Sequence, residues 1–196
     1  MKKVGIIVIG LIFGASAVAI ANYHATSNYS VIGGPAPTGA GPSMVLAVGT
    51  PLRLKVPSIH IDAPVTPLGV NAQGNMAAPT DAVHVGWYKL GPRPGMSGAA
   101  VIDGHLNTKL VPQAVFYNLG KVKPGDEVDI QTDDGKTIVF SVTKIETFPY
   151  TSNADEVFVS TSTTPLLNLV TCTGDWLPEK HSYTDRLVVF TQLVSR

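Results

Sequence analysis

Three side chains could together support nucleophilic catalysis: Cys172, His105 and Arg186. Cys172 is the only cysteine in the sequence, so it cannot form a disulfide within its own chain. In an exported protein a leftover cysteine is a reactive thiol or an intermolecular bridge. An apolar run ends at Cys172 and passes directly into Gly174 and Asp175, which predicts a thiol where a strand meets a loop. The alternative is a small buried apolar residue, the commoner role of a free cysteine.

A cysteine nucleophile needs a partner that forms or stabilises the thiolate, because the thiolate is the reactive form. His105 follows an apolar run and a glycine, so both it and Cys172 are expected at strand ends, where they could lie side by side. The alternative is an ordinary polar loop histidine. The other histidines have less suitable settings: His24 in a Gly/Pro-rich stretch, His60 in an alternating strand, and His84 and His181 in loops.

Arg186 opens the last apolar run of the sequence, at residues 186–190. If residues 166–172 and 186–193 form neighbouring antiparallel strands, Arg186 and Cys172 lie at the same end of the sheet. A guanidinium there could hold a substrate carbonyl or the oxyanion that forms during acyl transfer. The alternative is a solvated arginine at a strand end.

Short strands are expected to position these residues, since apolar and polar residues alternate in several segments. An Asp-Gly turn at residues 134–135 separates two of them and is typical of a hairpin. About seven or eight strands without a long amphipathic helix predict an all-β closed barrel or a sandwich. One helical turn is expected at 114–119. The predicted strands are 52–56, 59–62, 99–102, 127–131, 137–145, 166–171 and 187–193.

Composition restricts the class of protein. Lys plus Arg and Asp plus Glu each number 14, so no basic surplus indicates nucleic acid. Charged residues make up 14% of the chain, too few for a helical bundle. Residues 51–196 suit one folded domain with a substantial core. Residues 22–50 are rich in Gly and Pro and are expected to form a flexible spacer.

The first 21 residues have the character of a leader, with Lys2 and Lys3 followed by an uncharged run from residue 4 to residue 21. This run approaches the length that spans a bilayer, about 17–25 residues. With the lysines in the cytoplasm, it predicts a signal anchor, a transmembrane helix that leaves the domain outside the cell. The alternative is a signal peptide cleaved after a small-x-small site, such as residues 17–19 or 19–21, which would make the protein secreted.

The three candidate residues also match a family pattern. The chain resembles the sortases, cysteine transpeptidases of Gram-positive cell surfaces, whose motif ends one strand with Thr-Leu-x-Thr-Cys and begins the next with arginine. Residues 168–172 read Asn-Leu-Val-Thr-Cys, Arg186 follows, and Gly104-His105 fits the family's histidine motif. Residues 86–88 and 94–95 resemble the actinobacterial type called class F. Asn168 departs from the usual first threonine. Other stretches similar to the family are 51–57, 115–119 and 124–126.

The resemblance implies the eight-stranded sortase barrel over residues 51–196. It implies that Cys172 attacks the threonine carbonyl of a Leu-Pro-x-Thr-Gly-like sorting signal, His105 acts as acid and base, and Arg186 binds the substrate carbonyl or oxyanion. The thioester would pass to an amine of a peptidoglycan precursor or a pilin lysine, with no metal or organic cofactor. Loops 148–165 and 173–185 would wall the substrate groove. Substrate contacts are expected from Thr171, Asn107 and Trp176.

Two other functions fit the residues. An exported cysteine peptidase would resolve the same thioester with water. A non-catalytic β-barrel on a membrane stalk would bind a partner without chemistry, although the presence of all three candidate residues does not favour it.

Overall fold

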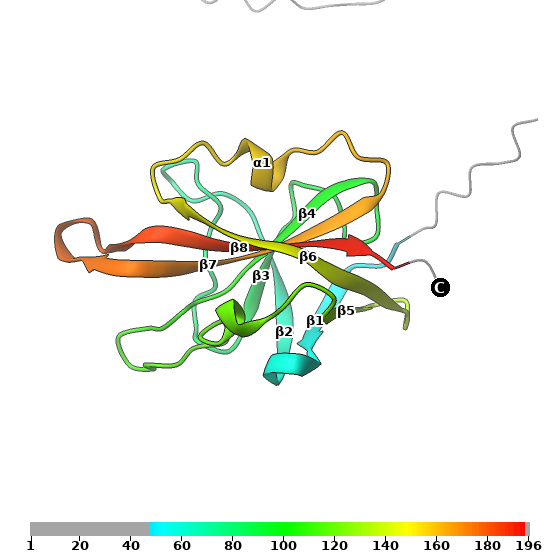
Figure 1. Cartoon of the computed structure of the whole chain (residues 1–196), viewed down its shortest axis with the longest axis horizontal. Coiled ribbons are helices and arrows are strands. Elements are labelled where there is room, and N and C mark those ends of the chain that lie inside the picture. The colour runs from blue at the N-terminus through cyan, green and yellow to red at the C-terminus, as the bar shows by residue number, and fades with distance from the viewer. Residues whose placement is uncertain (1–47, 195–196) are drawn as a thin grey trace, which may run out of the picture. The chain divides into compact units, whose positions relative to one another are not determined.

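The computed structural model describes residues 48–194. Eight strands in this part close into a barrel in the order β1-β2-β3-β4-β7-β8-β6-β5 (Figure 1). The predicted all-β closed barrel is therefore confirmed, and the sandwich is excluded. The strands are β1 (Pro51–Val56), β2 (Ile61–Leu68), β3 (Val85–Tyr88), β4 (Gly98–Asp103), β5 (Glu127–Thr132), β6 (Thr137–Pro149), β7 (Pro165–Leu177) and β8 (Ser182–Leu193).

Two of the strand pairings are parallel, β2 with β3 and β4 with β7, while the remaining pairs are antiparallel. A parallel pair needs a long connection. The connection from β4 to β7 carries β5, β6 and α1 (Asp155–Phe158). This topology brings the end of β4 beside the middle of β7, although the two segments are far apart in the sequence.

The barrel is filled by the inward-facing residues of its strands. Strand side chains alternate between faces, so one set per strand enters the interior. The fully buried side chains include Leu54, Ile130, Phe140, Leu167 and Leu169. Removing such apolar surface from water is the main stabilising term for the barrel.

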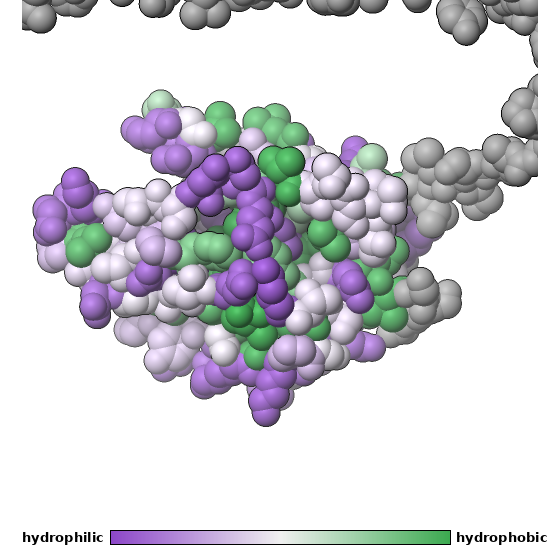
Figure 2. Space-filling view, turned by 45° about the horizontal axis from the view of Figure 1, so that its top comes forward, coloured by the Kyte–Doolittle hydropathy of each residue, from purple (hydrophilic) through white to green (hydrophobic). Residues whose placement is uncertain are grey.

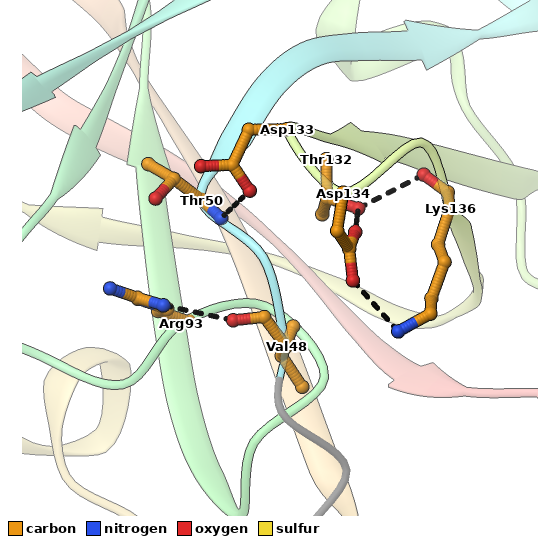
Figure 3. Close-up of polar contacts among 7 residues, drawn as sticks. All are labelled: Val48, Thr50, Arg93, Thr132, Asp133, Asp134 and Lys136. Carbon is orange, nitrogen blue, oxygen red and sulfur yellow. Dashed lines mark hydrogen bonds and ion pairs between the residues drawn. The ribbon is translucent and has the colours of Figure 1, made fainter.

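The start of β1 is fastened to the β5–β6 hairpin (Figure 3). The Thr50 amide donates to Asp133 Oδ1 at 2.8 Å, and Lys136 Nζ donates to Asp134 Oδ2 at 2.7 Å. A Cβ at Gly49 would lie 2.5 Å from Asp133 Oδ1, so the carboxylate that accepts from the Thr50 amide would have to shift. Gly135 has φ +78°, as expected for the predicted Asp-Gly turn.

The predicted strand at 59–62 is wrong in its first half. Residues Pro57–Ile59 form a 3-10 turn, η1, and His60 ends it in the left-handed region with φ 58°. Proline at the first position of η1 has a fixed φ and no amide donor, which favours a turn over a paired strand. His60 is therefore a turn residue, and β2 begins only at Ile61.

Three further elements differ from expectation. β3 was not predicted, because its four residues Val-Gly-Trp-Tyr are short and nearly all buried, without alternation. The predicted helical turn at 114–119 is a series of turns that ends in the 3-10 helix η2 (Leu119–Lys121). The predicted loop at 173–185 is mostly a β-hairpin closed by η3 (Pro178–Lys180), since Trp176 pairs with Tyr183 and Leu177 with Ser182.

The predicted signal anchor at residues 4–21 and nearly all of the spacer at 22–50 lie outside the described residues. Within residues 48–194, no helix is long and apolar enough to cross a membrane.

Candidate active site

Cys172 and Arg186 are direct neighbours on adjacent strands. In the antiparallel β7–β8 pair their Cα atoms are register partners. The prediction that both lie at strand ends is wrong, because β7 continues to Leu177 and β8 begins at Ser182. The register becomes irregular just beyond Cys172, between Thr173 and Trp176, so the pair lies where the barrel gives way to the hairpin.

His105 approaches from the other side of β7. In the parallel β4–β7 pair Asp103 is level with Val170, and the Gly104 amide donates to the Val170 carbonyl at 3.1 Å. The Thr171 hydroxyl donates to the Gly104 carbonyl at 2.8 Å. Continuing this register by two residues brings the backbone of His105 level with Cys172. The three candidate residues thus form one row, with His105 just beyond the end of β4, Cys172 on β7 and Arg186 on β8.

The tautomer of neutral His105 follows from its hydrogen bond. Nε2 lies 2.8 Å from the Pro79 carbonyl oxygen. A carbonyl oxygen only accepts, so Nε2 carries the proton and donates it. Nδ1 is then the nitrogen with a free lone pair, and it is the atom that can exchange a proton with a thiol or a substrate.

The guanidinium of Arg186 is held by its own hairpin. Nη1 donates to the carbonyls of Tyr183 at 3.2 Å and Asp185 at 2.8 Å, and Nη2 donates to Ser182 Oγ at 2.9 Å. Arg186 is partly buried rather than a solvated residue on the rim. A guanidinium has five N–H donors, so these bonds orient the group and leave donors for a ligand.

The thiol of Cys172 is protonated at rest. Burial raises its pKa, the positive charge of Arg186 lowers it, and the negative charge of Asp103 raises it again. The net direction is upward, so thiolate must be formed during reaction by transfer of the proton to a base. The position of His105 makes it the candidate base.

Asp103 was not predicted as a site residue. Burial raises its pKa from 3.8 to about 7. One of its oxygens, Oδ1, is buried and has no hydrogen-bond partner among the described residues. The sequence contained one indication, an acidic residue ending an otherwise apolar strand two positions before His105, but an Asp before Gly looks like a turn residue.

A groove of about 690 Å³ runs up to this row. Arg186, Asp103, Val170 and Val188 line it, so the groove is lined by the cross-strand partner of Cys172, although Cys172 and His105 are not themselves lining residues. Figure 2 turns the α1 side of the barrel toward the viewer and shows a band of hydrophilic side chains across this face, with a hollow beside it. The other lining segments are residues 71–78, 148–158 and 180–182. The predicted walls at 148–165 and 173–185 therefore each contribute residues to the groove.

The three predicted substrate contacts have different settings. Thr171 is buried, and its hydroxyl is occupied by the bond to Gly104, so it joins β7 to the end of β4 and does not line the groove. Asn107 Nδ2 donates to the Tyr183 hydroxyl at 2.6 Å, and Trp176, half exposed, packs edge-on against the Tyr183 ring at 5.2 Å. Tyr183, not predicted from sequence, joins these two residues beside Arg186.

No cluster of three or more His, Cys, Asp or Glu side chains within residues 48–194 is placed to bind a metal ion. His84 is paired with Asp81, Nδ1 to Oδ2 at 2.7 Å. His181, the residue that ends η3, also lines the groove, whereas His105 does not.

The fold is a closed mixed β-barrel. Its site places a partly buried cysteine beside an arginine that is hydrogen-bonded to its own hairpin, with a histidine level with both. This combination is typical of proteins that transfer acyl groups through a thiol. The chain belongs to the sortase domain family, whose family model matches residues 54–194. Membership of this family implies a cysteine transpeptidase. None of the curated proteins compared matches the chain.

Several solved structures share the fold. A lid mutant of sortase A from Corynebacterium diphtheriae superposes with TM-score 0.59 at 20% identity, covering 76% of this chain and 72% of that one. Sortase C-1 from Actinomyces oris gives TM-score 0.57 at 24% identity, with coverage of 74% and 73%. Sortase C2 of Group B Streptococcus pilus island 1 gives TM-score 0.56 at 21% identity, with 73% of each chain covered.

Proposed function

We propose that this protein is a cell-surface sortase of the class F type, which cleaves a Leu-Pro-x-Thr-Gly-like sorting signal and transfers the acyl fragment to an amine. The observation that carries the proposal is the row formed by His105, Cys172 and Arg186 at the end of the groove. Cys172 lies on β7, Arg186 on β8 and His105 just beyond the end of β4. Each offers a group that acyl transfer requires: a nucleophile, an oxyanion donor and a base.

The first half of the reaction forms a thioester. Nδ1 of His105 takes the proton of the Cys172 thiol, and Sγ attacks the threonine carbonyl carbon. The negative charge that develops on the carbonyl oxygen is stabilised by Arg186, whose guanidinium is already oriented by the hairpin. As the C–N bond breaks, the proton on His105 passes to the departing amine.

The second half returns the enzyme to its starting state. An incoming amine, from a peptidoglycan precursor or a pilin lysine, attacks the thioester carbon and gives a proton to Nδ1 of His105. The C–S bond breaks, and Cys172 recovers the proton. Water in place of the amine would give hydrolysis, which is the reaction of the peptidase alternative.

The proposed location follows from the leader. Residues 4–21 would anchor the chain in the membrane as a single span, residues 22–50 would act as a spacer, and the barrel would work outside the cell. The partners would be surface proteins with a C-terminal sorting signal.

Mass spectrometry of the protein incubated with a Leu-Pro-x-Thr-Gly peptide tests the function, with and without an added amine. We expect a thioester adduct on Cys172, and an amide product once the amine is present. Cys172→Ala should form neither and should keep the fold, because it removes a single sulfur atom from a strand position that is only partly buried. Release of free acid despite excess amine would identify a peptidase. No adduct with any sorting peptide would favour a binding module.

A further inference from the structure

The floor of the groove contains a carboxyl group that the proposed chemistry does not use. Asp103 lines the groove together with Val170 and Val188, its neighbours on β7 and β8. It is the last residue of β4, two residues before His105, and is level with Val170, which lies two residues before Cys172 on β7. Side chains two residues apart on a strand share a face. Asp103 therefore lies along the groove, two strand residues away from the row formed by His105, Cys172 and Arg186.

The hydrogen bonding of this carboxyl is incomplete. Oδ1 is buried and has no hydrogen-bond partner within residues 48–194, and Asp103 takes part in none of the ion pairs formed there. Its neighbour on β3, Gly86, leaves room for it, because a Cβ at that position would lie 2.5 Å from Oδ1. A carboxyl with incomplete hydrogen bonding is costly to bury, and Asp103 lines the groove, so a donor that enters the groove would stabilise this group.

The other charged groups on the groove have the opposite sign. Lys180 and Arg186 line it, and His181 lies between them in the hairpin turn. Arg186 is already bonded to the hairpin, and Lys180 is an exposed side chain on the rim. Without Asp103 these cations would favour an acidic peptide. The carboxyl in the floor therefore decides the sign of the charge that the groove accepts near the thiol.

We propose that Asp103 is a specificity-determining residue, which accepts a hydrogen bond from a donor side chain at the position before the cleaved threonine. The proposal rests on the proposed function. Two residues along a strand span roughly 6.6 Å, so an extended peptide reaches Asp103 within two residues of its scissile carbonyl. In Leu-Pro-x-Thr-Gly the proline offers no donor, which leaves x. Lysine, arginine and glutamine at x supply the donor, and glutamate is rejected.

Pairing at Asp103 also acts on the nucleophile. The negative charge of Asp103 opposes formation of the Cys172 thiolate. A donor from the peptide, most of all a cationic one, offsets that charge when substrate is present. Selection at x should therefore appear in the acylation step as well as in binding.

The test is kcat/KM for four peptides, with Lys, Gln, Ala or Glu at x, measured as acyl-enzyme formation at pH 8, where Asp103 with its pKa of about 7 is ionised. For the wild type we expect Lys to exceed Glu by about tenfold to hundredfold, the range of a charge-assisted hydrogen bond. Asp103→Asn should remove the preference in kcat/KM for Lys over Glu at x, or reverse it so that Glu is preferred. The matched control Glu179→Gln removes a negative charge from the exposed η3 turn and should keep the wild-type ratio.

The outcomes separate the two proposals. Equal acylation of all four peptides by the wild type, or an unchanged Lys-to-Glu ratio in Asp103→Asn, would overturn the role of Asp103 and leave the sortase function standing. No acylation of any peptide would overturn the function, and this inference with it. Thermal melting reports folding, and Asp103→Ser provides the same comparison if the asparagine variant does not fold.

Discussion

Cys172 on β7 and Arg186 on β8 are direct cross-strand partners, so the thiol and the guanidinium leave the barrel at the same level. The arginine lowers the pKa of the thiol, against the larger upward effect of burial. The same guanidinium is bonded to two carbonyl oxygens and one hydroxyl of the hairpin. The conformation of the hairpin and the electrostatics of the nucleophile therefore depend on one side chain.

We expect Arg186→Lys to be nearly as damaging as Arg186→Ala. The planar guanidinium makes three bonds in fixed directions, whereas an ammonium is a mobile point charge that cannot reproduce them. Loss of one oxyanion donor costs about 10²–10³ in rate. Steady-state kinetics of both variants on one sorting peptide measure this. Near-wild-type activity of the lysine variant would mean that charge alone suffices.

His105→Ala should reduce kcat by about 10²–10⁴-fold, the usual contribution of proton transfer. His105 is level with Cys172 and bonds through Nε2, which leaves Nδ1 to exchange a proton, while His181 lies in the hairpin turn and lines the groove. His181→Ala is the matched control and should change KM more than kcat. Both variants are assayed with the same peptide. The opposite ranking would show that the cysteine works with the hairpin histidine.

The alkylation rate of Cys172 should have a pH midpoint above that of an ordinary thiol, since burial raises its pKa. Asp103→Asn should lower the midpoint, because it removes a negative charge that disfavours thiolate. Arg186→Ala should raise it, because it removes the positive charge that favours thiolate. Iodoacetamide kinetics across pH 6–10 measure all three proteins. Shifts in the same direction for both variants would contradict the assigned charges.

Asp103 should make stability fall as pH rises from about 4 to about 7. Its folded pKa of about 7 exceeds the ordinary 3.8, so in this window the folded protein binds more protons than the unfolded chain. Asp103→Asn removes this dependence. We expect the variant to be more stable than the wild type at pH 8 by about 2–4 kcal/mol, with no such advantage below pH 4. Urea unfolding at pH 4, 6 and 8 measures the difference. A constant difference would exclude titration of Asp103 as its source.

Much of the barrel could be predicted from local pattern. The alternating segments at 127–131 and 137–145 and the turn between them became β5, β6 and their hairpin. The 173–185 segment was not recognised as strand, because its pairing depends on a register irregularity and on Gly174 at φ +84°. β3 was missed because its short buried sequence has no period of two.

The sequence by itself determined which groups are available: a single cysteine after an apolar run, a Gly-His pair, and an arginine before the last apolar run. Local composition and motif spacing are sufficient for that. Only the tertiary structure decided that the parallel β4–β7 pair brings His105 level with Cys172. It also decided that the Pro79 carbonyl selects the histidine tautomer, and that Oδ1 of Asp103 is buried without a hydrogen-bond partner within residues 48–194. These properties arise from contacts between segments distant in the sequence, and burial and pairing of that kind leave no local pattern.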